Sequence, residues 1–339
     1  MEIIKLDNIC DVKTGNKNKE NNDENGLFPF YTRSQIILKS NNYTIDEEAI
    51  IIPGEGSFIP MWNMGKAAIH QRTYIIKSSN LNKLLNKYLY YWWFKNYKIL
   101  KQSAVGSTVK SLRKFHFLKP QINLPNLKYQ QDIISIIEPF ENLNNSIINL
   151  IFKLKIIYLN IINNHFSSRG LMRDNEIIFK KGINFNRDML SNNKEGICFI
   201  NVSAINNNAN KFIKNNYKEL INTKIGDIIL SLDANVGLVN NFLFGINGYG
   251  FKVFSKNEKF KNYQIYFSLL NKFNQQIMQK FATGTTIKHA NRAKNHLILL
   301  DFLSWNKLLK LIYEYEIKLK MMSEKIKLII SNLIKLLVK

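Results

Sequence analysis

Apolar residues recur with a seven-residue period in two long segments of the chain, where steps of four and three positions alternate. The first segment carries the stripe Ile133, Ile137, Phe140, Asn144, Ile147, Ile151, Leu154, Tyr158 and Ile161. The second carries Leu308, Ile312, Tyr315, Leu319, Met322, Ile326, Ile329, Leu333 and Leu336. Such a heptad pattern is typical of a coiled coil, although one heptad helix alone also fits an ordinary core helix. Because two matching stripes occur, we predict that the two helices pair with each other.

Two residues disturb the first stripe. Asn144 occupies a seam position, where a polar residue costs stability but fixes the register or the partner of a helix. Pro139 lies inside the segment. We expect it to kink or restart the helix, because proline has no backbone N–H and crowds the preceding turn.

Outside the helical segments, short apolar runs that enter turns predict strands. They are Ile36–Leu38, Ala49–Ile52, Thr73–Ile76, Ile197–Asn201, Asp227–Leu230 and Phe251–Phe254. Helical patterns cover Leu81–Trp93 and Tyr263–Phe273. The aromatic cluster at 88–94 fits a core better than a base-stacking platform. The mixture predicts an α+β protein.

The chain contains an internal repeat. Residues 104–110 read AVGSTVK and residues 282–288 read ATGTTIK, at an offset of 178 (282 − 104). At the same offset, the apolar run 48–54 corresponds to 226–232. A period this long indicates a duplicated domain rather than a solenoid. We therefore predict two mixed α/β domains, over 1–127 and 167–305, separated by long helices over 128–166 and 306–339 that pair as an antiparallel coiled coil.

The amino-acid composition indicates the class of binding partner more than it indicates the fold. The 339 residues include 48 Lys and Arg against 25 Asp and Glu, a formal net charge of +23. An excess this large favours polyanionic partners, nucleic acid first and an anionic membrane surface second. An A+T-rich genome, which accumulates Lys, Asn and Ile codons, also contributes to this composition. With 45% hydrophobic and 12% aromatic residues, wholesale disorder is excluded.

The two cysteines, Cys10 and Cys198, are too few for a disulfide framework or a four-thiolate zinc site. They fit a reducing cytosol, and the N-terminal residues lack the apolar region of a signal peptide. No uncharged run approaches the roughly 20 residues that span a bilayer. We therefore expect a cytoplasmic protein without a membrane partner.

Signatures of catalysis are missing from the sequence. It contains neither a phosphate-binding G-x-x-x-x-G-K-[ST] loop nor the Asp/Asn-Pro-Pro-aromatic segment with which amino-methyltransferases hold a base. The five histidines stand at no metal-ligand spacing, and Glu55 and Asp233 read as isolated carboxylates in loops. We therefore expect no catalytic residue, no metal and no cofactor in this chain.

Basic residues follow both repeated turns, in Lys110–His116 and Lys288–Lys294. Backbone N–H groups of a Gly-Ser-Thr turn suit phosphate oxygens, and Arg side chains also make bidentate contacts to guanine. For a single Lys a solvated surface is the better interpretation, but two such segments at equivalent positions favour DNA. The candidate DNA-binding residues are Thr108, Lys110, Arg113, Lys114, Thr286, Lys288, His289, Arg292 and Lys294.

Taken in order, these motifs resemble those of the specificity subunit of type I restriction–modification systems. There, a domain ends in an Ala-x-Gly-Ser/Thr-Thr turn and a strand, followed by an L-P-x-L segment, a glutamine pair and a long helix, all given twice. Here the corresponding segments are 104–108, 124–127 and 130–131. The run 226–231, with Val236-Gly237, resembles the strand and turn of the family's second target recognition domain. The second copy departs at 299–303 and lacks the glutamine pair.

The resemblance implies a non-catalytic subunit in which each target recognition domain reads half of a bipartite site in double-stranded DNA. It also implies that the paired helices dock two modification subunits, which carry S-adenosylmethionine and methylate adenine N6. Restriction subunits can join for ATP-dependent cleavage. Two alternatives stay open: a stand-alone nuclease or methyltransferase-like enzyme with fused recognition domains, and a coiled-coil scaffold that binds DNA without sequence preference.

Overall fold

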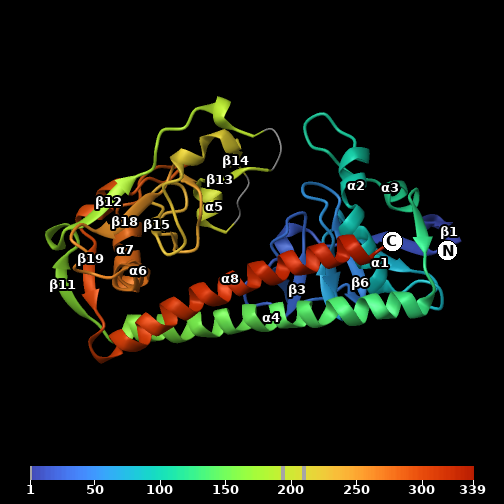
Figure 1. Ribbon diagram of the computed structural model, residues 1–339, viewed down its shortest axis with the longest axis horizontal. Helices are drawn as coiled ribbons and strands as arrows, with labels where there is room; N and C mark the ends of the chain where they lie inside the picture. The colour runs from blue at the N-terminus through green and yellow to red at the C-terminus, as the bar shows by residue number, and fades with distance from the viewer. Residues whose placement is uncertain (1, 192–194, 208–210) are drawn as a thin grey trace. The chain divides into compact units, whose positions relative to one another are not determined.

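The computed structural model describes residues 2–191, 195–207 and 211–339 (Figure 1). The chain divides into two compact units: Met1–Asn144 with Lys325–Lys339 form unit 1, and Asn145–Glu324 form unit 2. Each unit combines β-sheets with part of each of two long helices. The predicted mixed α and β class is therefore confirmed.

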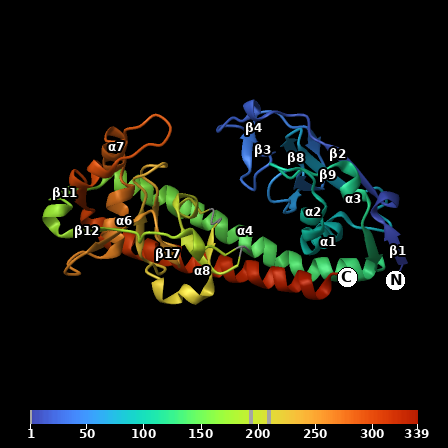
Figure 2. The same cartoon turned by 90° about the horizontal axis from the view of Figure 1, so that it is seen from above.

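Unit 1 is built on two four-stranded sheets and a two-stranded one. Its elements are β1 Glu2–Lys5, β2 Cys10–Thr14, β3 Phe28–Tyr31, β4 Leu38–Ser40, β5 Ile45–Asp46, β6 Ala49–Pro53, β7 Met61–Asn63, β8 Lys66–Ile69, β9 Thr73–Ser78, α1 Asn86–Asn96, α2 Lys98–Ser103, α3 Lys114–Leu118 and β10 Gln121–Leu124. The sheet orders are β2-β9-β6-β7, β4-β3-β8-β5 and β1-β10. Figure 2 shows β3 beside β8, with which it pairs in parallel. Strand β6, with the sequence AIIIP, is buried along its whole length because it lies between β9 and β7 and beneath α1.

Helix α1 carries the aromatic cluster into the core of unit 1. The rings of Tyr88, Tyr91 and Trp93 are buried, which confirms the core interpretation. The buried side chain of Gln130, from the glutamine pair, lies at the start of this helix. Its Oε1 accepts the N–H of Leu85 at 2.8 Å and its Nε2 donates to the carbonyl of Lys83 at 2.7 Å. The glutamine motif thus ties the following long helix to α1.

Unit 2 repeats this topology. Its elements are β11 Ser167–Leu171, β12 Ile177–Lys181, β13 Ile197–Ile200, α5 Val202–Ile205, β14 Phe212–Ile213, β15 Ile228–Leu230, β16 Val239–Asn240, β17 Ile246–Asn247, β18 Phe251–Ser255, α6 Asn262–Leu270, α7 Lys272–Lys280 and β19 Ile298–Asp301. The orders β12-β18-β15-β16 and β11-β19 match those of unit 1, and the sheet β14-β13-β17 corresponds to β4-β3-β8, without a strand equivalent to β5 among the described residues. Strands β13 and β17 are again parallel. The repeat seen in the sequence is therefore a repeat of structure.

Helices α4 (Leu127–Asn164) and α8 (Asn306–Leu337) each contribute to both units. In unit 1, Ile133 and Ile137 near the start of α4 share a core with Ile334 near the end of α8. In unit 2, Tyr158 near the end of α4 shares a core with Ile312 near the start of α8. The helices therefore pair in antiparallel directions, which confirms the predicted coiled coil.

Helix α4 does not restart at Pro139, because one helix continues across it. The proline ring leaves the carbonyl of Ser135 without its helical N–H donor. Both residues are exposed, so water can take the place of that donor. The expected interruption therefore does not end the seam.

The predicted stripe of α4 lies on the seam, since all its members are buried or half-buried. The stripe predicted for α8 is wrong at alternate positions, where the residues are exposed. These are Leu308, Tyr315, Met322, Ile329 and Leu336. The buried or half-buried positions are the next residues along the chain, Leu309, Glu316, Ser323, Ile330 and Leu337. Ile312, Leu319, Ile326 and Leu333 lie on the seam as predicted.

The error in α8 has a simple physical origin. Both choices give alternating steps of three and four, so the period alone does not separate them. The apolar neighbours Tyr315 and Met322 favoured the wrong phase. The helix instead buries the polar residues Glu316 and Ser323, whose exposed fractions are 3% and 4%.

One helix in the described part of the chain, α4, is long and apolar enough to cross a bilayer by length and composition. A long apolar seam in a coiled coil meets the same two criteria. Here the seam residues of α4 are buried or half-buried within the two units, which accounts for part of its apolar composition.

Candidate nucleic-acid interface

The repeated turn folds as the same loop in both units. In unit 1, Val105 and Ser111 exchange backbone hydrogen bonds of 3.0 and 2.8 Å. In unit 2, Thr283 and His289 exchange bonds of the same lengths, 3.0 and 2.8 Å. We call residues 105–111 and 283–289 the hairpin loops. Their bonding pattern repeats at the offset of 178 residues (283 − 105) found in the sequence.

Each hairpin loop requires its glycine. Gly106 and Gly284 adopt φ angles of +129° and +111°, a region that L side chains rarely occupy. A Cβ atom would lie 2.2 Å from the carbonyl oxygen of Val109 in the first loop and 2.3 Å from that of Ile287 in the second. The Ala-x-Gly motif therefore marks a turn that glycine forms without strain.

Each hairpin loop also docks against the end of a buried strand. The N–H of Leu112 donates to the carbonyl of Gly54, directly after β6, at 2.8 Å. The N–H of Ala290 donates to the carbonyl of Leu232, shortly after β15, at 2.8 Å. A rigid sheet thus positions an exposed loop in both units.

The candidate DNA-binding residues lie on the hairpin loops or directly after them, and all are exposed except half-buried Lys294. Arg113 and Lys114 stand at the start of α3, and Arg292 and Lys294 in the 3-10 turn Asn291–Asn295. The Nζ atom of Lys294 lies 5.2 Å from the centre of the Phe251 ring, a cation–π contact that gives it a packing role. Contact of these residues with DNA stays a prediction.

The interpretation of Glu55 as an isolated carboxylate is wrong. Its Oε2 lies 2.9 Å from Nη1 of Arg33 and its Oε1 lies 2.8 Å from Nη1 of Arg72. The hydrogen bond from Arg33 holds the pKa of the Glu55 carboxyl below its usual range. The three residues come from three loops, 22 and 17 positions apart. Because the contacts are non-local, no spacing in the sequence signals them.

Asp233 is not isolated either. Its Oδ1 lies 2.7 Å from Nδ1 of His289, a member of the second hairpin loop. A carboxylate that follows the central strand thus holds a basic side chain in both units.

Two other histidines have structural roles. The Nδ1 of His116 accepts the N–H of Arg113 at 2.8 Å, at the start of α3. The Nδ1 of His70 accepts the N–H of Arg72 at 3.0 Å. Burial lowers the pKa of both imidazoles, which favours the neutral form that these bonds require. His70 therefore fixes the turn that carries Arg72.

Each domain body contacts a long helix through a largely buried lysine, which pairs with a glutamate of that helix. In unit 1, Nζ of Lys87 lies 2.7 Å from Oε2 of Glu141 on α4, which also accepts the Tyr91 hydroxyl at 3.1 Å. In unit 2, Nζ of Lys320 on α8 lies 2.7 Å from Oε1 of Glu316 and 3.3 Å from Oδ1 of Asn241 in the domain body. These contacts set the rotation of each helix against its domain.

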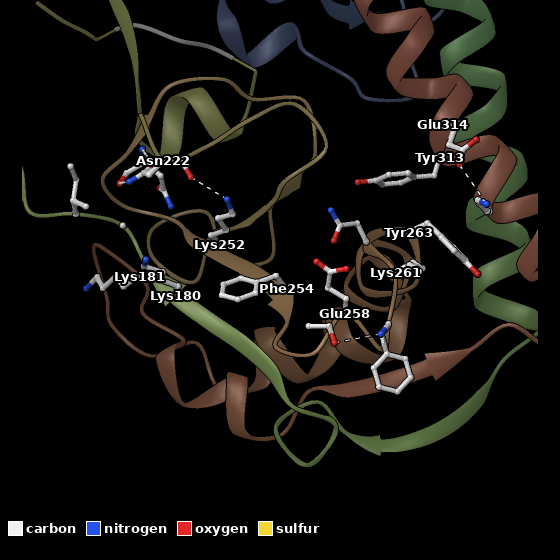
Figure 3. A pocket seen from close by; sticks show the side chains of 17 residues that line it. Lys180, Lys181, Asn222, Lys252, Phe254, Glu258, Lys261, Tyr263, Tyr313 and Glu314 are labelled. Atoms are coloured by element: carbon white, nitrogen blue, oxygen red, sulfur yellow. Dashed lines mark hydrogen bonds and ion pairs between the residues drawn. The ribbon is translucent and has the colours of Figure 1, made fainter. Parts of the chain in front are cut away.

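A pocket of about 900 Å³ opens in unit 2 and was not anticipated from the sequence (Figure 3). Its charged lining comprises Lys180, Lys181, Lys252, Lys261, Lys310, Glu258 and Glu314. Asp227 neutralises Lys252 at 2.6 Å. The rings of Phe254 and Tyr263 add an apolar surface. Lysines outnumber carboxylates in the lining, in line with the basic character of the chain.

Among the residues that the structure describes, no group of three or more His, Cys, Asp or Glu side chains is arranged to hold a metal ion. The two cysteines are free.

Comparison with known proteins places these features in a family. Residues 1–153 match the type I restriction modification DNA specificity domain. The type I restriction enzyme EcoDI specificity subunit of Escherichia coli is 27% identical over 126 residues, 37% of this chain and 28% of that protein. A protein of Haemophilus influenzae, also named as a type I restriction enzyme specificity subunit, is 36% identical over 118 residues, 34% of this chain and 27% of that protein. The aligned segments thus span less than a third of either relative.

The crystal structure of a type I restriction–modification S subunit from M. genitalium shares the fold, with a TM-score of 0.54 at 14% identity. The similarity covers 100% of this chain and 96% of that one. The fold is therefore that of two mixed α/β units that share two long helices, and the first unit matches a DNA specificity domain. Residues 1–153 thus match the family's DNA specificity domain, and the chain is similar to type I restriction enzyme specificity subunits.

Proposed function

We propose that the chain is the sequence-specific DNA-binding subunit of a type I restriction–modification complex. Its target recognition domains, over 1–127 and 167–305, each read one half of a bipartite site. The observation that carries this proposal is the repeated hairpin loop, held by the same backbone bonds against a buried strand in both units. Two similar and exposed basic loops suit two half-sites in one duplex.

Charge supports DNA as the ligand. A formal net charge of +23 favours a polyanion, and the candidate residues present Lys, Arg and Thr side chains to solvent. Backbone N–H groups and cations position a duplex through its phosphates, whereas base contacts determine sequence. We assign the hairpin loops and the residues that follow them to this interface.

The helix segments 128–166 and 306–339 are proposed to dock two modification subunits. Nine apolar residues, spaced by seven along each helix, are exposed by 39–79%. We call them the outer edge: Ile136, Leu143, Leu150 and Ile157 on α4, and Leu308, Tyr315, Met322, Ile329 and Leu336 on α8. All stand at heptad position g, and in an antiparallel pair the g positions of the two helices lie beside each other. They therefore form one apolar edge in each unit.

The opposite edge is already occupied. At heptad position e, Ile134 and Ile334 are buried in the core of unit 1, and Ile162 and Tyr313 in that of unit 2. The outer edge is exposed along both helices, and apolar surface of this extent favours a protein partner.

The chain itself is proposed to be non-catalytic and cytoplasmic. The modification partner would supply S-adenosylmethionine and methylate adenine N6 in the bound site, and restriction subunits would join the same assembly. The chain would determine where the partner flips its target base.

Methylome sequencing tests this proposal in a host that expresses the chain with its modification partner. We expect an asymmetric, bipartite motif with adenine methylation in both halves and a fixed spacer. Salt-sensitive binding with no methylated motif would instead support a non-specific scaffold. Methylation or cleavage by the purified chain alone would support an enzyme with fused recognition domains.

A further inference from the structure

We propose that Glu55 is a positioning residue that presents Arg33 and Arg72 as a pair of base-reading forks, and that the half-site read by unit 1 contains guanine at the contacted positions. This inference rests on the proposed function. It concerns the arginine–carboxylate cluster, Arg33, Glu55 and Arg72, which lies outside the basic segments noted in the sequence.

The cluster leaves both guanidinium groups available to a ligand. Each arginine uses Nη1 for the carboxylate, and among the described residues no other partner engages its remaining N–H groups. The exposed fractions of the Arg33 and Arg72 side chains are 47% and 59%, against 16% for Glu55. The Glu55 carboxylate is thus mostly covered, whereas the two guanidinium groups that it holds are exposed to solvent.

The backbone around Glu55 is adapted to this arrangement. The N–H of Gly54 donates to the carbonyl of Arg72 at 2.9 Å, and a Cβ on Gly54 would lie 2.8 Å from that oxygen. Gly56 has a φ of +90°, and a Cβ there would lie 3.3 Å from the carbonyl of Arg33. A glycine on each side therefore lets the Glu55 loop approach both arginine loops closely.

The cluster also adjoins the hairpin loop of unit 1. Glu55 forms a backbone bridge with Ser111 at the base of that loop. The equivalent bridge in unit 2 joins Asp233 to His289, at an offset of 178 residues (233 − 55). The acidic position is therefore common to both units, while the basic side chains that it holds differ. An acidic residue at a constant position that holds different basic side chains suits two domains that read two different half-sites.

Arginine reads guanine in preference to other bases because its planar fork donates two parallel hydrogen bonds to O6 and N7 in the major groove. A lysine at the same place keeps the charge but loses the fork. The cluster therefore predicts a different outcome from a phosphate contact, which lysine also makes.

The test uses the complete complex of this chain with its modification subunits. Binding to the methylated motif and to single-base variants is measured by competition, alongside methylome sequencing. The variants are Arg33→Lys, Arg72→Lys, Glu55→Gln and Glu55→Asp. Asp174→Asn is the matched control, because Asp174 pairs with Arg173 at 3.4 Å on an exposed surface of unit 2.

For Arg33→Lys and Arg72→Lys we expect discrimination at one guanine each to fall by about 5- to 150-fold, with the other half-site unchanged. Glu55→Gln should relax both positions, Glu55→Asp should retain part of the discrimination, and Asp174→Asn should change nothing. Weakening that is equal for all sequences would assign the arginines to phosphates and overturn the proposal, as would an unchanged motif in folded variants. If Glu55→Gln does not fold, the two exposed arginine variants decide. A wild-type complex without any motif would refute the proposed function instead.

Discussion

Replacing Lys320 by Met should destabilise unit 2 strongly, although the side chain lies near the surface. Glu316 is 3% exposed, and its Oε1 depends on Lys320 at 2.7 Å. Its Oε2 has no hydrogen-bond partner. Lys320→Met therefore leaves a buried carboxylate without a cation, which costs about 3–5 kcal/mol. We expect about 3 kcal/mol, because a quarter of the Lys320 side chain, 25%, is exposed and water can reach its place.

The double variant Glu316→Leu/Lys320→Met should recover most of this loss. Removing both charges also removes their desolvation, so its stability should lie within about 1 kcal/mol of the wild type or above it. Lys310→Met is the matched control on the same helix, because its pair with Glu314 is exposed and 4.0 Å long. It should cost less than about 0.5 kcal/mol.

Urea unfolding followed by hydrogen exchange in peptides of unit 2 measures these differences. This readout separates the core of unit 2 from that of unit 1. Equal costs for Lys320→Met and Lys310→Met would refute the reasoning, because the buried pair would then behave like a surface pair. A double variant less stable than Lys320→Met would refute it as well.

Four further outcomes are expected. Gly284→Ala should strain the second hairpin loop and weaken binding to one half-site. Gly226→Ala, at a φ of +95° but with an open Cβ position and outside the hairpin loops, should strain the backbone without weakening binding in the same competition assay. Burial raises the pKa of the Cys10 thiol from 9.0 to about 12, so the unfolded chain loses this proton first as pH rises. Between these two pH values the free energy of unfolding should fall by about 1.4 kcal/mol per pH unit, and Cys10→Ala should remove that part of the slope in urea titrations. Met322→Glu with Ile329→Glu on the outer edge should abolish co-purification of the modification subunit, whereas Met321→Glu, exposed but off that edge, should not. Inserting seven residues into both α4 and α8 keeps the seam in phase and adds about 10 Å of helix, so the methylated motif should gain about three base pairs of spacer; an active complex with an unchanged spacer would show that the helices do not set the distance.

Local patterns predicted much of the architecture. The apolar runs at Ala49–Ile52 and Phe251–Phe254 are strands β6 and β18, because each is bounded by turns and buried by neighbouring strands. The run Ile36–Leu38 fared worse: strand β4 begins at Leu38, and Ile36 and Ile37 are exposed. An apolar run predicts a strand, but the sequence does not show which of its side chains become buried, and these two isoleucines stay exposed.

The seam residues of α8 and the contacts of the Glu55 carboxylate could not be predicted from the sequence, for different reasons. A heptad period of 3.5 fits two adjacent sets of α8 residues equally well. The burial of Glu316 beside Lys320 shows which set lies on the seam. The contacts of Glu55 with Arg33 and Arg72 depend on how three loops are brought together, which no spacing encodes. The hairpin loops were found because duplication repeats their sequence within one chain.

The composition of unit 1 has a consequence for the order of events during synthesis. Ile334 and Val338 belong to its core, and the Tyr129 hydroxyl donates to the carbonyl of Leu337 at 3.0 Å. The ribosome makes Asn144 long before these residues. At ~5–20 residues per second, the 195 residues from there to Lys339 (339 − 144) take about 10–40 s. Throughout that interval the nascent first unit lacks one wall of its core, while unit 2 completes itself. Because unit 2 ends at Glu324, all its residues are made before Lys325–Lys339, so we expect unit 1 to complete its core last and the nascent first unit to be the species that needs protection from aggregation.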